Sequence, residues 1–321
     1  MSGSRKDVPQ RIVIASREST LAMWQARHVE ARLAAHYPRT EIAILGVTTE
    51  GDRRLDVSLA RIGGKGLFIK ELEDALAAGR ADIAVHSVKD VPMTLPPGFA
   101  LAAITEREDP RDAFISGRYA RLAAMPAGAR IGTSSLRREC QLRARHPGLK
   151  VVPLRGNVPT RLKKLDEGQY DAIIVAAAGL KRLGLADRIT ALLAPEDSLP
   201  APGQGALGIE CQAERADLVT LLAPLNHAPS AACIAAERAL SRTLSGNCNV
   251  PLAAFAEINH INIYLRACVG LPDGTRLVAG ERRGAVAEAE ATGMALAQEL
   301  KSRGASEILA ALEAQAAAAR G

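Results

Sequence analysis

The chain has 321 residues, which exceeds the usual size of one hydrophobic core and predicts two or three domains. Apolar residues make up 48% and charged residues 24%, as is typical of a soluble globular enzyme, and the formal net charge of +6 suits a polyanionic partner. Aromatic residues are only 3%, which argues against a base-stacking surface for single-stranded nucleic acid, and no apolar run approaches the ~20 residues of a membrane span.

The strand and helix patterns begin with one α/β unit. An apolar run at 11–15 is followed by helical spacing at 20–36, with Ser19 as the expected N-cap. Further strands are expected at 41–47, 82–86 and 100–105, and a further helix at 67–78. This alternation predicts an α/β domain over 9–106 with a largely parallel sheet.

A second α/β unit is predicted over 110–200. Its strands are expected at 129–133, 150–154 and 171–176, and its helices at 135–145, 159–167 and from 180 onward. The Pro-rich segment 199–203 leads to a strand at 206–211, which we expect to return to the first sheet, so that 204–224 joins the first domain. Two crossings between two α/β units predict a hinge with a cleft between them.

The last part of the chain, 228–321, predicts a small α+β domain. A helix at 231–244 leads to a polar turn that holds Cys248. Alternating segments at 252–258, 261–269 and 276–281 predict strands, and Ala-rich helices are expected from about 286.

The five cysteines, at positions 140, 211, 233, 248 and 268, include no Cys-x-x-Cys pair. An odd number of widely spaced cysteines indicates reduced thiols, and the polar N-terminal segment has no apolar secretory core. We therefore expect a cytoplasmic protein without a metal site. Cys248 lies in a loop where a thiol is accessible for chemistry, although an inert free cysteine is the alternative that the loop alone favours.

Two glycine-containing or hydroxyl-rich turns precede helices and are typical of anion sites. The first is Gly63-Gly64-Lys65-Gly66, for which a simple glycine turn with a solvated lysine is the alternative. The second is Gly132-Thr133-Ser134-Ser135, followed by Arg137 and Arg138 in the first helical turn. Cations are unfavourable at a helix N-terminus, so local stability does not explain this arginine pair and an anionic ligand would. A solvated basic face is the alternative, which we favour less.

Single arginines also follow several predicted strands or segment ends: Arg17, Arg155, Arg161 and Arg182. Ligands of open α/β sheets bind beyond the carboxyl ends of the strands, and the arginine fork matches a carboxylate. Each arginine alone is typical of a surface residue. Together they predict a pocket for a polycarboxylate or a phosphate.

The segment His86-Ser87-Val88-Lys89-Asp90 ends another predicted strand. Asp90 is an acid among many cations, which keeps it ionised and able to stabilise a cationic intermediate or to handle protons. For His86 we favour a core histidine with a satisfied hydrogen bond. The spacing Gly203-x-Gly205-x-x-Gly208 formally matches a dinucleotide fingerprint but precedes a strand, so we reject it.

Taken together, these motifs resemble the hydroxymethylbilane synthase family, also called porphobilinogen deaminases. The resemblance runs from about Ile12 to beyond Arg283. Its most specific segments are 63–68, 84–92, 106–114, 132–138, 154–157, 178–184 and 199–210. Around Cys248, Asn247 and Asn249 replace the neighbours common in the family, and asparagine tolerates the same turn geometry.

The resemblance implies a monomeric enzyme that joins four porphobilinogen molecules head to tail, with loss of ammonia, and then releases linear hydroxymethylbilane by hydrolysis. It implies two periplasmic-binding-protein-like (type II) α/β domains around a cleft, plus a small C-terminal α+β domain. It also implies a dipyrromethane cofactor, bound through a thioether to Cys248, and a catalytic aspartate at Asp90.

The remaining site residues are likewise carried over from the family. Those expected to hold the cofactor are Ser87, Lys89, Thr133, Ser135, Arg137, Arg138, Arg155 and Gly156. Those expected to bind the substrate are Arg17, Ser19, Gln25, Lys65, Phe68, Arg161, Arg182 and Gln204. Two other function classes remain as alternatives: a hinged anion-binding protein without catalysis, and a nucleic-acid binder with a basic surface.

Overall fold

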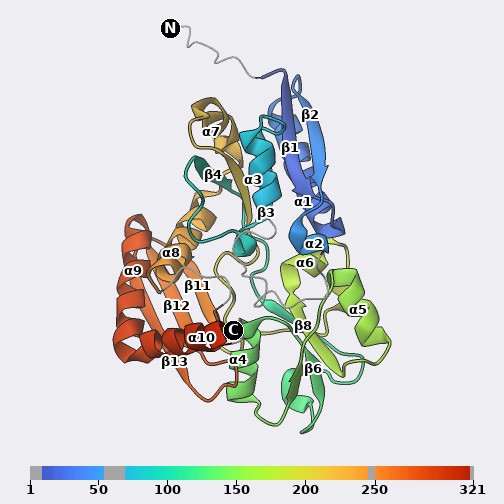
Figure 1. The fold of residues 1–321 in the computed structure, drawn as a ribbon, viewed down its shortest axis with the longest axis vertical. Helices are drawn as coiled ribbons and strands as arrows, with labels where there is room; N and C mark the ends of the chain where they lie inside the picture. The colour runs from blue at the N-terminus through green and yellow to red at the C-terminus, as the bar shows by residue number, and fades with distance from the viewer. Residues whose placement is uncertain (1–8, 54–68, 245–249, 319–321) are drawn as a thin grey trace.

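The computed structural model describes residues 9–53, 69–244 and 250–318. Three separate sheets organise these residues, and the first two lie one above the other in Figure 1, with the third beside them. The predicted fold class of two α/β domains and a C-terminal α+β domain is therefore confirmed.

The first sheet has five strands in the order β2-β1-β3-β10-β4. Strand β1 is parallel to β2 and β3, whereas β10 is antiparallel to β3 and β4, so the sheet is mixed. The predicted return of the chain to this sheet is confirmed, because β10 lies between β3 and β4. The elements of this unit are β1 (Arg11–Arg17), α1 (Thr20–His36), β2 (Glu41–Val47), α2 (Glu50–Arg53), α3 (Lys70–Ala77), β3 (Ile83–Ser87), β4 (Phe99–Ile104), β10 (Leu207–Gln212) and α7 (Ala216–Leu222).

The second sheet also has five strands, in the order β7-β6-β8-β5-β9. Strand β6 is parallel to β7 and β8, and β5 is antiparallel to β8 and β9. The sequence patterns did not predict β5 or β9. The elements are β5 (Asp112–Ile115), β6 (Arg130–Gly132), α4 (Leu136–Arg145), β7 (Lys150–Val152), α5 (Val158–Asp166), β8 (Ala172–Ala176), α6 (Ala177–Arg182) and β9 (Ala191–Leu192).

The third sheet is an antiparallel meander of β11, β12 and β13. Helices α8 and α9 pack against each other and against this sheet, and their apolar side chains form the largest buried cluster of this unit. The predicted elements are present here, although β13 is longer than expected. The bounds are α8 (Ala228–Leu244), β11 (Leu252–Asn259), β12 (Asn262–Gly270), β13 (Leu277–Ala285), α9 (Ala289–Leu300) and α10 (Ser306–Ala318).

Short helical turns complete the described structure. A kink at Lys301–Ala305 separates α9 from α10, with Gly304 in a non-helical conformation at φ 104°. The 3₁₀ turns are Val88–Asp90, Leu122–Ala124, Ala186–Arg188, Ala223–Leu225 and Val286–Glu288.

Helix α1 shows how local sequence and tertiary packing agree. The Ser19 hydroxyl accepts a hydrogen bond from the Ala22 amide at 3.3 Å, which satisfies one of the unpaired amides of the first turn and confirms the predicted N-cap. Ala26, Val29 and Leu33 then bury one face of the helix against the first sheet. The helix is thereby held with its N-terminus at the carboxyl end of β1, the edge at which Figure 1 shows α6 of the second unit.

The third unit ties together both chain crossings between the first two. The Arg107 guanidinium, on the first crossing, donates to the Glu237 carboxylate of α8 at 2.6 and 3.2 Å, and the same carboxylate accepts from the Gly203 amide on the second crossing at 2.7 Å. Glu237 is fully buried. A buried carboxylate is retained only when it is paired and hydrogen-bonded, as it is here.

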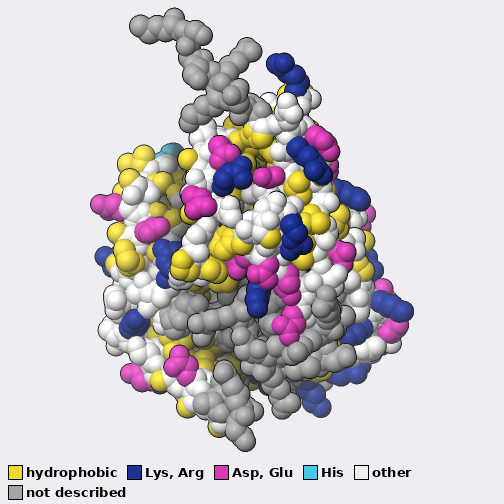
Figure 2. Space-filling model, turned by 45° about the horizontal axis from the view of Figure 1, so that its top comes forward, with side chains coloured by type: hydrophobic (Ala, Val, Ile, Leu, Met, Phe, Trp, Pro, Cys, Tyr) yellow, Lys and Arg dark blue, Asp and Glu magenta, His cyan; other side chains and the backbone are white. Residues whose placement is uncertain are grey.

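Figure 2 shows acidic and basic side chains intermixed over the visible face of the molecule. Over the described ranges, no single helix has the length and apolarity to cross a membrane, and the pair Ala216–Leu225 and Ala228–Leu244, bent by 112°, meets that test only when taken together.

Candidate active site between the first two sheets

The carboxyl end of β3 carries the central polar groups. After Ser87 the chain makes a single 3₁₀ turn, Val88–Asp90, with Val88 buried beneath it. Burial lowers the pKa of the Lys89 ammonium to about 8, an effect that the adjacent Asp90 carboxylate opposes. Asp90 is exposed and accepts no hydrogen bond from any residue that the structure describes. The turn therefore presents an amine and a free carboxylate side by side.

Arg161 of the second unit lies within electrostatic range of this turn, and Arg155 lies close to Arg161. Arg161, on α5, donates through Nε to the Gly156 carbonyl at 2.7 Å. Burial, together with Arg138 and Arg155, lowers its pKa to about 10, against the opposing effect of Asp90. These charges act on one another only at short range, so residues from β3, α4 and α5 meet at one place. No ion pair with a described acid is formed by Arg155 or Arg161, so both cations remain available for an anion.

The backbone around these cations is built by turns that the sequence predicted. Ser135 caps α4 by accepting from the Arg138 amide at 3.4 Å, and the Thr133 hydroxyl accepts from the Ser135 amide at 3.2 Å. Gly156 has φ +111°, and a Cβ there would lie 2.7 Å from the Thr160 methyl carbon. Only glycine fits that position, because the conformation and the space both exclude a side chain.

Ser87 ends β3, Gln25 lies in α1, and Gln204 lies on the second chain crossing. Gln25 is buried in α1 and donates to the Ser87 hydroxyl at 2.8 Å, which links α1 to the end of β3. The Gln204 amide donates to the Pro110 carbonyl at 2.6 Å and to Asp112 at 2.9 Å. Arg17 ends β1, and Ser19 caps α1.

Arg137 and Arg138 are paired with an acid that the sequence analysis did not identify. Both guanidinium groups are buried and donate to the Asp112 carboxylate, each with a contact of 2.8 Å. The sequence analysis expected an anionic ligand beside this arginine pair; Asp112, at the start of β5, supplies an internal anion, so a ligand is not needed to account for the two cations. Burial alone would raise the pKa of Asp112, but the two arginines hold it far below its usual range.

Asp112→Asn is expected to destabilise the protein strongly. The substitution leaves two buried cations without their anion, and breaking such a cluster typically lowers the free energy of unfolding by about 3–5 kcal/mol. The measurement is urea denaturation at pH 7. Asp166→Asn, which breaks the exposed pair with Arg188, is the matched control and should change the free energy by less than about 1 kcal/mol. An equal change in the free energy of unfolding in both variants would contradict the conclusion that Asp112 neutralises the two buried arginines.

The contact of Asp112 with Arg137 and Arg138 predicts that the stability of the protein depends on pH. A carboxyl group with a lowered folded-state pKa contributes its full stabilisation above its unfolded pKa of about 3.9 and loses it as the pH falls further. The wild type should therefore lose stability below about pH 4, and the asparagine variant should lack this component.

His86 is a buried histidine, as the sequence analysis favoured. Its Nε2 atom lies 2.7 Å from Oε2 of Glu210, and both side chains are buried. The pair joins the end of β3 to β10.

Three of the predicted site residues, Lys65, Phe68 and Cys248, lie outside the described residues. Their roles, like those of the described site residues, remain predictions.

Comparison with known proteins shows the family to which the chain belongs. The sequence model described as porphobilinogen deaminase, dipyromethane cofactor binding domain, matches residues 12–220, and that of the porphobilinogen deaminase C-terminal domain matches residues 231–302. The chain belongs to the porphobilinogen deaminase family. Curated relatives of that name are 62% identical in Chromobacterium violaceum and 63% identical in Nitrosomonas europaea, each covering 95% of this chain and 99% of the relative. Among solved structures, the methionine-binding protein MetQ has a TM-score of 0.43 at 13% identity and covers 68% of this chain and 90% of that one.

The described residues fit the dipyrromethane cofactor of the porphobilinogen deaminases. The buried Nε atoms of Arg137 and Arg138 have no hydrogen-bond partner, although their other donors are engaged. Together with Lys89 and Arg155, these donors match a group that carries several carboxylates. In the described ranges no group of three or more His, Cys, Asp or Glu side chains is placed to hold a metal ion.

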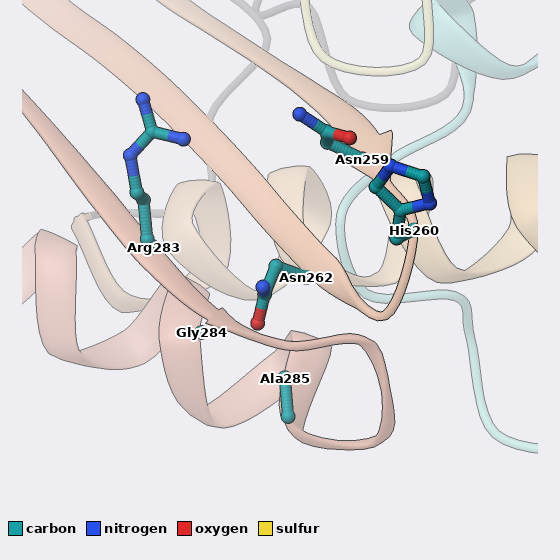
Figure 3. A pocket seen from close by; sticks show the side chains of 6 residues that line it. All are labelled: Asn259, His260, Asn262, Arg283, Gly284 and Ala285. Atoms are coloured by element: carbon teal, nitrogen blue, oxygen red, sulfur yellow. The ribbon is translucent and has the colours of Figure 1, made fainter.

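The C-terminal unit contains a separate surface hollow. Figure 3 shows it beside the turn between β11 and β12, lined by Asn259, His260, Asn262, Arg283, Gly284 and Ala285. None of the predicted site residues lines it, so it does not belong to the candidate active site.

Sequence reasoning missed the structural partners of the site, Asp112, Arg107 and Glu237. The only signal was the run of alternating charges at 106–112, which the family resemblance included without assigning roles. A charged residue's partner 25 or 130 positions away cannot be recognised from local spacing.

Proposed function

We propose that the chain catalyses the hydroxymethylbilane synthase reaction: the stepwise joining of four porphobilinogen molecules with loss of ammonia, followed by hydrolytic release of the linear tetrapyrrole. The observation that carries this proposal is the Asp90 carboxylate, which accepts no hydrogen bond from the described residues and lies within electrostatic range of Lys89 and Arg161. Neither these two cations nor Arg155 forms an ion pair with a described acid. Porphobilinogen carries two carboxylates and becomes electron-poor when ammonia leaves. The site has cations for the carboxylates and one carboxylate for the developing positive charge.

Each described residue has a defined task in this proposal. Lys89, Arg155, Arg161 and Arg182 bind carboxylates and neutralise the charge that accumulates as the product grows. Asp90 accepts hydrogen bonds from pyrrole N–H groups and stabilises positive charge on the substrate. Asp112 holds Arg137 and Arg138 in place. Their Nε atoms, which have no hydrogen-bond partner among the described residues, are then available as donors to the carboxylates of the cofactor. When bound, dipyrromethane supplies the covalent primer to which substrate units are joined.

Cys248 is proposed as the attachment point of the cofactor. The other four cysteines are buried, and burial raises the pKa of the Cys140 and Cys233 thiols to about 12 and that of Cys268 to about 11; the pKa of Cys211 is also raised. A thiol with such a pKa is a poor nucleophile at neutral pH. This leaves Cys248 as the best candidate, in agreement with its position in the family motif.

Turnover tests the proposal directly. The purified protein is incubated with porphobilinogen, and ammonia release and tetrapyrrole formation are followed together. One ammonia for each porphobilinogen consumed, with a linear tetrapyrrole as the product, is the expected result. Binding of porphobilinogen without ammonia release would instead support a hinged anion-binding protein. We further propose that the protein is a cytoplasmic monomer, which analytical ultracentrifugation and cell fractionation would test.

A further inference from the structure

Helices α1 and α6 bring the first two units into direct contact through an aromatic side chain. A Cβ at Gly179 of α6 would lie 3.7 Å from Leu21 of α1, so the two helices approach closely, as Figure 1 shows. One turn further along α1, the Trp24 ring centroid lies 5.8 Å from the Arg182 guanidinium carbon. This distance is within the range of a cation–π contact. Trp24 is the only tryptophan of the chain.

His28 supports the indole on the same helix. Its ring stacks on that of Trp24 with centroids 5.1 Å apart and an interplanar angle of 8°. Residues four positions apart lie on one helix face, so α1 presents both rings at the contact with the second unit. Trp24 is partly exposed and does not belong to the apolar cluster that joins α1 to the first sheet. Packing of the core therefore does not account for it.

Arg182 is also held by a hydrogen bond to the second chain crossing, and its remaining N–H groups are unpaired among the described residues. One Nη donates to the Gly205 carbonyl on the second chain crossing at 2.6 Å. Its other N–H groups have no hydrogen-bond partner among the described residues. Burial lowers the pKa of the guanidinium to about 10, against the opposing effect of Glu108 on the first crossing. The side chain remains charged at neutral pH and touches both units and a crossing.

We propose that Trp24, braced by His28, is a positioning residue that holds Arg182 between the two units so that its free N–H groups face the carboxylates of the substrate. This inference rests on the proposed function, in which Arg182 binds a carboxylate. The contact needs arginine, because a planar guanidinium can lie over an indole while donating at its edge, which a lysine ammonium cannot do in the same way. The substrate need not touch Trp24 itself.

The charge state of His28 bears on the same contact. Burial lowers the pKa of His28, and the charged groups that face it, Arg32 on α1 and Arg182 on α6, lower it further. At neutral pH the ring is uncharged. At lower pH a protonated His28 repels Arg182 and competes with it for the indole face, so the positioning of Arg182 should weaken as the pH falls through the pKa of His28.

A double-mutant cycle with the cofactor-loaded enzyme tests the inference. Trp24→Leu should raise KM for porphobilinogen about tenfold with kcat within about twofold, and Trp24→Phe should recover most of the loss because it retains an aromatic face. In an Arg182→Gln background, Trp24→Leu should cause little further loss, because its effect passes through Arg182. An unchanged tenfold loss in that background would overturn the inference. If Trp24→Leu does not fold, Trp24→Phe carries the cycle with an expected effect of about threefold.

The pH profile gives a second, independent readout. His28→Gln should remove the rise in KM that the wild type shows at low pH, and His36→Gln, an exposed histidine at the other end of α1, should retain it. Identical profiles in all three proteins would contradict the role of His28. Failure of Arg182→Gln to affect KM would count against the proposed function of Arg182, whereas an impaired Arg182→Gln with a normal Trp24→Leu would refute only the inference about Trp24.

Discussion

Cys248→Ser is expected to give a folded protein that lacks both cofactor and turnover. A serine hydroxyl is essentially never ionised near neutral pH, so it cannot replace a thiolate as the nucleophile that forms the attachment. Serine has nearly the size and shape of cysteine, so the free energy of unfolding should change little. The measurement is the intact mass of the purified protein: the wild type should exceed its sequence mass by two linked pyrrole units, and Cys248→Ser should not.

Cys140→Ala is the matched control for this experiment. Cys140 is buried in α4, and its thiol donates weakly to the Arg137 carbonyl, so the alanine variant should lose some stability but retain the added mass and activity. Restored or unchanged turnover in Cys248→Ser, or loss of the added mass in Cys140→Ala, would refute the assignment of Cys248 as the attachment point.

Asp90→Asn is expected to lower kcat by about 10²–10³-fold while leaving the cofactor mass in place. Asparagine has nearly the shape of aspartate, but it lacks the negative charge that stabilises a cationic intermediate. Its amide N–H groups also repel the pyrrole N–H donors that a carboxylate would accept. Because Asp90 is exposed and has no described partner, its loss should not lower the melting temperature.

Asp187→Asn serves as the control for Asp90→Asn. Asp187 is also exposed and lies in a 3₁₀ turn of the second unit, among the residues of another surface hollow. Its replacement should leave kcat unchanged. A loss of less than about tenfold in Asp90→Asn would argue against stabilisation of positive charge by Asp90.

Local features of the fold were largely accessible from the sequence. The helix at 20–36 was predicted with its N-cap because Ser19 and the apolar spacing are local signals, and β10 was placed in the first sheet because the Pro-rich crossing precedes it. Strand β5 was missed. It begins at Asp112, whose burial depends on two arginines far along the chain, and a charged residue is a poor predictor of a buried strand.

The residues of the candidate site were likewise predicted from the sequence, whereas their internal partners were not. Motif spacing and strand ends identified Lys89, Asp90, Arg155 and Arg161, since ligands of α/β sheets gather beyond the strand ends whichever partners surround them. The sequence by itself thus determined the order of the elements, the supply of cations and the family. Only the tertiary structure decided which cations are occupied internally: Arg137 and Arg138 by Asp112, Arg107 by Glu237, and Arg182 by the face of Trp24. The physical reason is that the field at a buried charge depends on distance in space and on exclusion of water, and neither quantity is written in the spacing of residues along the chain.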